Sequence, residues 1–276
     1  MTLSEISKAL QNTNATIDSG IKVVLNSLKL QAIQDSDEKL ANILWCYETI
    51  YEIENLYITA YAHLKKACAV NGNRDAVGYD SEKAKEYEKA WLLLDECDIL
   101  IGSLEKNFCI DGLNIDDFHI QEILDDIKRL QPLFPYKVFG SRETIIKAQK
   151  CSICGKTISV RNPCGHIPGR IYMGEMCSRE ITDFEFLNIN LVSKPFDKYS
   201  IIKPEGALVR FDYLDYIVPH IKPFMKWSYM KEKRLRPEYD GIERNKKCPC
   251  GSGMKYKHCI RKNPGIHYMD HYKFLV

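Results

Sequence analysis

The sequence lacks an apolar run of about 18 residues, so we expect no membrane-spanning helix. Its first residues, MTLSEISKALQNTNATIDSG, lack the basic start and apolar centre of a secretory signal. It also lacks a paired-carboxylate motif, a glycine-rich phosphate loop and a nucleophile signature, which mark common classes of enzyme. We therefore expect a cytoplasmic protein with no catalytic activity and no small-molecule substrate.

Cysteine, by contrast, is abundant, with 11 among 276 residues. Because no secretion signal precedes them and several are spaced like metal ligands, reduced thiols in a cytosol are expected rather than disulfides. The hydrophobic share of 45% and the charged share of 28% are ordinary for a globular chain. A chain of this length forms one large domain or two to three small ones.

The formal net charge of +2 conceals an uneven distribution. Residues 221–276 carry 14 Lys and Arg against 5 Asp and Glu, a net charge of +9, which leaves −7 for the residues before them. A basic C-terminal region on an acidic body predicts an anionic partner, namely a protein, a ribosome or nucleic acid.

Apolar residues recur at helical spacing through the first half of the chain. Four helical segments are expected: 3–33 with a weak middle, one from Ser36 or Asp37 to Asn71, one from Ser81 to Gly102, and one from Asp116 to Pro132. Residues 1–135 are thus predicted to form an antiparallel helical bundle.

The pattern changes after residue 135. Residues 186–192 alternate as in a strand, and β-branched residues cluster between 137 and 162. An α+β fold is therefore predicted. Its three further parts are a zinc-nucleated α+β domain at 136–218, a basic connector at 219–247 and a zinc module at 248–276.

Five candidate zinc ligands lie within the central segment CSICGKTISVRNPCGHIPGRIYMGEMC. Cys151 and Cys154, followed by glycine, form a knuckle in which two thiolates converge on one ion, and Cys177 is the natural closing thiolate. The fourth ligand is either Cys164 or His166, and the rigid turn around His166 favours the histidine. A site rich in thiolates is typical of structural zinc.

This segment shows two further family resemblances. It resembles zinc knuckles of uncharacterised bacterial and phage proteins through Gly169, Tyr172, Gly174 and Cys177, which implies no activity. The Cys-x2-Cys pair followed by Gly-His-Ile-Pro also resembles an HNH nuclease, although Gly165 stands where that family has Asp. The alternative function is therefore a nucleic-acid-processing enzyme, HNH-like or another nuclease, acting in phage–host conflict.

A second cluster, CPCGSGMKYKHC, spans Cys248 to Cys259. It resembles the SEC-C motif, a small zinc module found at the C-terminus of the preprotein translocase ATPase and in many otherwise unrelated proteins. The resemblance implies that Cys248, Cys250 and Cys259 bind zinc. The family's fourth ligand directly follows the third, where this chain has Ile260. His258 is favoured as its replacement, and His267 or His271 could reach back instead.

The SEC-C resemblance also implies a binding element rather than a catalyst. A module of about 20 residues cannot build an apolar core, so the metal supplies its folding energy and leaves the surface for contacts. We therefore expect two Zn2+ ions and a non-catalytic adaptor whose basic C-terminal module docks on a protein, a ribosome or nucleic acid.

Overall fold

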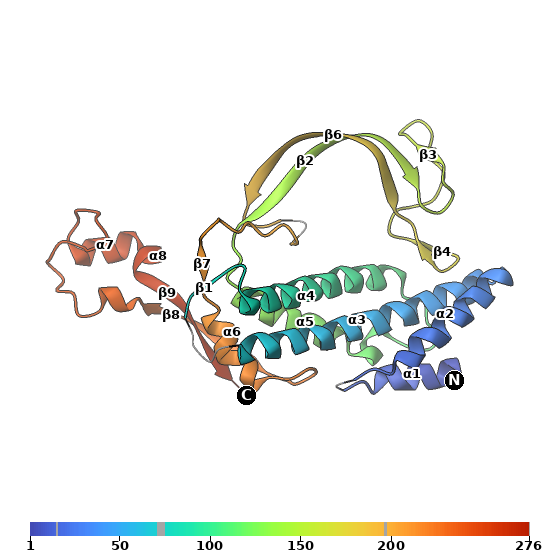
Figure 1. The fold of residues 1–276 in the computed structure, drawn as a ribbon, viewed down its shortest axis with the longest axis horizontal. Coiled ribbons are helices and arrows are strands. Elements are labelled where there is room, and N and C mark those ends of the chain that lie inside the picture. The colour runs from blue at the N-terminus through green and yellow to red at the C-terminus, as the bar shows by residue number, and fades with distance from the viewer. Residues whose placement is uncertain (15, 71–74, 196–197, 276) are drawn as a thin grey trace. The chain divides into compact units, whose positions relative to one another are not determined.

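The computed structural model describes residues 1–14, 16–70, 75–195 and 198–275. They form two compact units, Met1–Phe224 and Met225–Val276. Helices and small sheets occur in both units, which confirms the predicted α+β class (Figure 1). Within the described ranges no helix combines the length and the apolar character needed to cross a membrane.

The first unit begins with the predicted helices. They are α1 (Leu3–Gln11), α2 (Ser19–Gln34), α3 (Glu38–Ala69), α4 (Glu82–Asn107) and α5 (Ile120–Leu130), with short 3-10 turns at Ile115–Phe118 and Gln131–Leu133. Asp37 and Ser81 cap α3 and α4 with side-chain hydrogen bonds, as their positions predicted. Helix α4 continues past Gly102 because Leu104 beyond it is fully buried in the core.

Tyrosines on α3 belong to the core of these helices. Tyr57 donates a hydrogen bond of 2.7 Å to the buried carboxylate of Asp126 on α5, and Tyr61 donates to the same oxygen. Arg129 lies 3.2 Å from the other oxygen of Asp126. These partners compensate the burial of one charge and join α3 to α5.

Glu54 on α3 is a buried carboxyl that is satisfied only in part. The Thr13 hydroxyl donates to its Oε2 at 2.7 Å, whereas Oε1 accepts no hydrogen bond from any residue the structure describes. Burial disfavours the carboxylate and raises the pKa of Glu54 to about 8, against a lowering by the Thr13 hydrogen bond.

Glu54 should make stability fall with rising pH. The native state holds a proton that the unfolded chain releases near pH 4.5, so this stabilisation is present at lower pH and is lost as pH rises through about 8. Glu54→Gln should raise the melting temperature by several degrees at about pH 8.5 and change it little at about pH 5. Thermal unfolding at both values tests this, with the half-exposed Glu52→Gln as control. An equal shift at both values would contradict it.

In the described part of the first unit, the strands form three small sheets. A long ribbon pairs β2 (Phe139–Cys151) with β6 (Arg179–Val192), and β3 (Thr157–Ile158) joins the end of β2. The others pair β4 (Ile171–Tyr172) with β5 (Glu175–Met176), and β1 (Val77–Gly78) with β7 (Leu208–Val209). Helix α6 (Asp212–Ile217) and a 3-10 turn at Val218–His220 follow. The strand predicted at 186–192 is the second half of β6, which Figure 1 shows as a bowed ribbon with β2.

The second unit is built on another antiparallel pair, β8 (Ser228–Leu235) with β9 (Tyr268–Leu275). Between these strands lie a 3-10 turn at Pro237–Tyr239, helix α7 (Tyr256–Lys262) and helix α8 (Pro264–His267). The segment 219–247, expected as a connector, thus contains a strand. The small core of this unit consists of the buried Tyr239, Cys248, Tyr256 and Cys259.

Candidate metal centres

The central cluster begins where β2 ends at Cys151. The chain then turns through Gly155, whose φ of +67° suits glycine, and the Gly155 amide donates to the Cys151 carbonyl at 2.9 Å. Burial raises the pKa of the Cys151 thiol, but backbone amides of Cys154 and Ile153 donate to its sulfur and lower the pKa to about 6. The turn therefore stabilises a thiolate, the form that binds metal.

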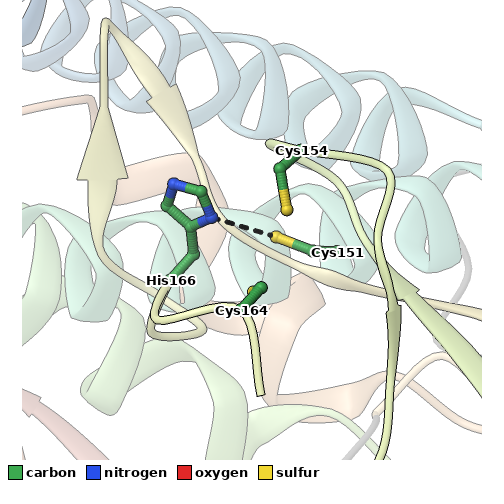
Figure 2. Close-up of side chains that lie close together, drawn as sticks. All are labelled: Cys151, Cys154, Cys164 and His166. Atoms are coloured by element: carbon green, nitrogen blue, oxygen red, sulfur yellow. Dashed lines mark hydrogen bonds between the residues drawn. The ribbon is translucent and has the colours of Figure 1, made fainter. Parts of the chain in front are cut away.

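Four side chains converge at this turn: Cys151, Cys154, Cys164 and His166 (Figure 2). Their ligand atoms all lie within 4.8 Å of one another, and Nδ1 of His166 is 3.7 Å from Sγ of Cys151. Three thiols and one imidazole are a donor set typical of tetrahedral structural zinc. The two residues between which the sequence left the choice open, Cys164 and His166, both belong to this group.

Cys177, expected as the closing ligand, lies beside the group rather than in it. Its Sγ is 3.8 Å from Sγ of Cys151, and the guanidinium of Arg179 approaches it at 3.7 Å. The same guanidinium lies 4.0 Å from Sγ of Cys164 and donates to the carbonyl of His166 at 2.7 Å. Arg179 thus places a positive charge beside several thiols, a role that no sequence motif indicated.

Hydrogen bonds connect the hairpin of β4 and β5, which follows the cluster, to helices α3 and α4. The side chain of Asn107, at the end of α4, donates to the Gly169 carbonyl at 2.7 Å and accepts from the Ile171 amide at 3.3 Å. The amide of Gly174 donates to Asn42 on α3 at 2.8 Å. Gly174 has a φ of +75°, and a Cβ there would lie 3.0 Å from a backbone oxygen of α3, so this contact requires glycine.

The second group consists of Cys248, Cys250, Cys259 and His267, whose ligand atoms also lie within 4.8 Å of one another. Nε2 of His267 is 3.1 Å from Sγ of Cys248, and the sulfurs of Cys250 and Cys259 are 3.4 Å apart. His258, the favoured fourth ligand, is exposed on α7 and is not among the four. The structure instead brings in His267, one of the two later histidines considered.

The surroundings of His267 suit a metal ligand. Its ring is fully buried beside Tyr239 and Tyr256, and its Nδ1 lies 2.8 Å from the carbonyl oxygen of Asn263. Donation from Nδ1 to that oxygen leaves Nε2, the atom facing the thiols, with its lone pair available. The residues present therefore fit zinc, held by three thiolates and Nε2.

Ser252 stabilises the thiolate form of a cysteine in this second group, and the thiolate is the form that binds metal. The Ser252 hydroxyl and the Ser252 backbone amide donate to Cys250 and lower the pKa of its thiol to about 6. The same hydroxyl lies 3.1 Å from Sγ of Cys259. Ser252 belongs to the Cys-Gly-Ser-Gly turn, so this part of the site follows from the motif itself.

Comparison with known families agrees with the C-terminal site. The SEC-C motif matches residues 244–259, a segment that includes the three cysteines of the second group but ends before His267. No solved structure shows a significant match to the chain. The chain therefore carries a SEC-C motif at its basic C-terminal region, and both of its Cys3His groups could hold zinc.

Proposed function

We propose that this protein is a zinc-stabilised, non-catalytic adaptor whose C-terminal unit docks on an anionic partner: a protein, a ribosome or nucleic acid. Each metal group offers four donors, enough to fill a tetrahedron, whereas hydrolytic zinc needs an open position for water. All eleven cysteines are unpaired, which suits a reducing compartment such as the cytoplasm.

The observation that carries the proposal is a basic cluster on the SEC-C motif, formed by Arg244, Lys247, Lys255 and Lys257. The backbone holds these residues together, since Lys247 and Lys255 face each other in an antiparallel bridge and the Lys257 amide donates to the Arg244 carbonyl at 3.0 Å. Like charges placed opposite each other destabilise a strand pair. An anionic partner would relieve that repulsion.

Acidic residues nearby do not neutralise the basic cluster. Asp270 lies within 3.0 Å of Lys231 and Lys233, and Glu243 lies 2.9 Å from Lys246. Within the described part of the chain, no acidic side chain forms an ion pair with a member of the cluster. Three of its four members are exposed and Lys257 is half-buried, so the charge faces solvent.

The double variant Lys247→Gln/Lys255→Gln tests this proposal. Fluorescence anisotropy would measure binding to a single-stranded RNA of about 20 nucleotides and to an acidic polypeptide. We expect binding to weaken at least fivefold for the true partner class. For RNA, the slope of log affinity against log salt should shrink by about 1.4, since two phosphate contacts are lost.

A charge-matched control is Lys226→Gln/Lys273→Gln, which changes two exposed lysines of the same unit outside the motif. It should leave binding within about twofold, because screening limits the effect of distant charges. Equal losses in both double variants would show a non-specific charge effect. No binding of either probe by the wild-type protein would reject the basic cluster as a docking site.

A further inference from the structure

The β2–β6 ribbon has two unlike faces. Residues paired directly across antiparallel strands project to the same face, and successive residues project to opposite faces. The register pairs Ile146 with Phe184, Thr144 with Phe186 and Arg142 with Ile189. One face therefore carries an apolar stripe, defined as Ile146, Phe184, Phe186, Ile189 and Leu191.

Side-chain contacts support this assignment of faces. A Cβ on Gly140, which pairs with Leu191, would lie 3.4 Å from a methyl carbon of Ile189, so Gly140 and Ile189 share the striped face. On the opposite face, Asn188 donates to Glu143 at 2.9 Å and Lys147 pairs with Glu185 at 2.9 Å. The ribbon is thus amphipathic: apart from Arg142, its charged and amide side chains lie on the face opposite the stripe.

The apolar stripe is exposed to solvent. Its members keep between 49% and 69% of their surface accessible. Large apolar surface gathered on one face of a strand pair is unusual unless another chain covers it. Arg142 is the only charged residue paired within the stripe, so an anionic membrane or nucleic acid would find few cations there.

We propose that the apolar stripe is the contact surface for a second copy of this chain, which forms a two-fold dimer by packing ribbon face against ribbon face. The exposed fractions amount to on the order of 600 Å² of mostly apolar surface per copy, hence on the order of 1,200 Å² for a pair, the lower limit for stable specific interfaces. A dimer therefore needs no surface beyond the stripe and its margins.

The relief of the striped face also suits a two-fold contact. Phe184, Phe186, Ile189 and Leu191 form a ridge of large side chains along β6, whereas β2 presents the smaller Thr144 opposite Phe186. A two-fold axis brings the same surface of both copies together, so the ridge of one copy can pack beside the ridge of the other. Arg142, paired with Ile189 on the same face, can stack its guanidinium on an aromatic ring across the contact.

The test is sedimentation equilibrium of the full-length, zinc-loaded protein over about 1–100 μM, the range that resolves a micromolar dimer. Ile146 and Ile145 give a matched pair, because they are adjacent, equally exposed at 49% and 50%, and on opposite faces. Ile146→Lys should weaken dimerisation at least tenfold. Ile145→Lys, which places the new charge opposite Glu185, should change it less than twofold.

Phe186→Lys, at the middle of the stripe, is a second variant in case Ile146→Lys misfolds, and circular dichroism with zinc content checks folding of each. A wild-type monomer at 100 μM would overturn the proposal and leave the stripe to another polypeptide or to another part of the same chain. A dimer that Ile145→Lys and Ile146→Lys weaken equally would overturn it as well.

Discussion

A His267→Ala variant should bind one zinc ion instead of two and should lose the fold of the C-terminal unit. His267 supplies the only non-sulfur donor of its group. Structural zinc contributes roughly 10–16 kcal/mol through four ligands, so one ligand accounts for on the order of 3 kcal/mol, or about a hundredfold in affinity. The buried ring also packs on Tyr239, so its removal leaves a cavity in a small core.

His258→Ala is the matched control for this variant. His258 is exposed on α7, one residue before Cys259, and its ring is not part of the metal group. It should retain two zinc ions by elemental analysis and melt like the wild-type protein. If His258→Ala lost the ion and His267→Ala kept it, the ligand assignment made from sequence would stand and the structural grouping would be mistaken.

The helices could be predicted because local signals and tertiary packing agree there. Asp37 and Ser81 can be recognised in the sequence as helix N-caps. The apolar residues that recur after each cap form the buried face of the helix. Gly102 was expected to end α4. The packing of Ile101 and Leu104 outweighs the roughly 1 kcal/mol that an interior glycine costs a helix.

The β2–β6 ribbon was harder to predict, because neither of its faces is buried in the first unit. Irregular pairing around Lys147, Thr182 and Leu187 also interrupts the alternation that marks a strand. Only residues 186–192 kept a clear pattern. A long exposed ribbon with one apolar face is therefore visible only once the register is known.

Metal ligands could be predicted from the sequence only where they lie close to one another along the chain. The cysteines of each turn are fixed by short spacings, so both groups could be located without coordinates. His267 follows Cys259 by eight residues, and only the turn from α7 into α8 at Asn263 and Pro264 returns it to the thiols. His267 is distinguished by a buried ring that a backbone carbonyl orients, and the spacing of residues in the sequence does not reveal this.

At the central site, Cys164→Ser and Cys177→Ser should behave differently. Sγ of Cys164 lies in the group of four donors, whereas Sγ of Cys177 approaches Cys151 but lies outside the group. We expect Cys164→Ser to weaken zinc binding by about a hundredfold, as for the loss of any one structural ligand. Cys177→Ser, which is nearly isosteric, should keep both zinc ions per chain.

Zinc content by elemental analysis distinguishes the two variants, and substitution with Co2+ adds a measure of the number of thiolates bound. Loss of metal from Cys177→Ser with retention in Cys164→Ser would restore Cys177 as the closing ligand predicted from the sequence. Retention in both would point to exchange between the two thiols at one coordination position, since a tetrahedral ion accepts four donors and five are present.

Arg179 gives a physical reason to expect loss of zinc from Cys164→Ser and retention of zinc in Cys177→Ser. Zn2+ with three thiolates and a neutral imidazole carries a net charge of −1, and the guanidinium of Arg179 can offset that charge from its position near Cys164 and Cys177. Cys177 is then best kept as an uncharged thiol, because a fourth thiolate would bring the local charge to −2 in a buried place. Its replacement by serine removes no charge from the site, so the ion and its four ligands should remain.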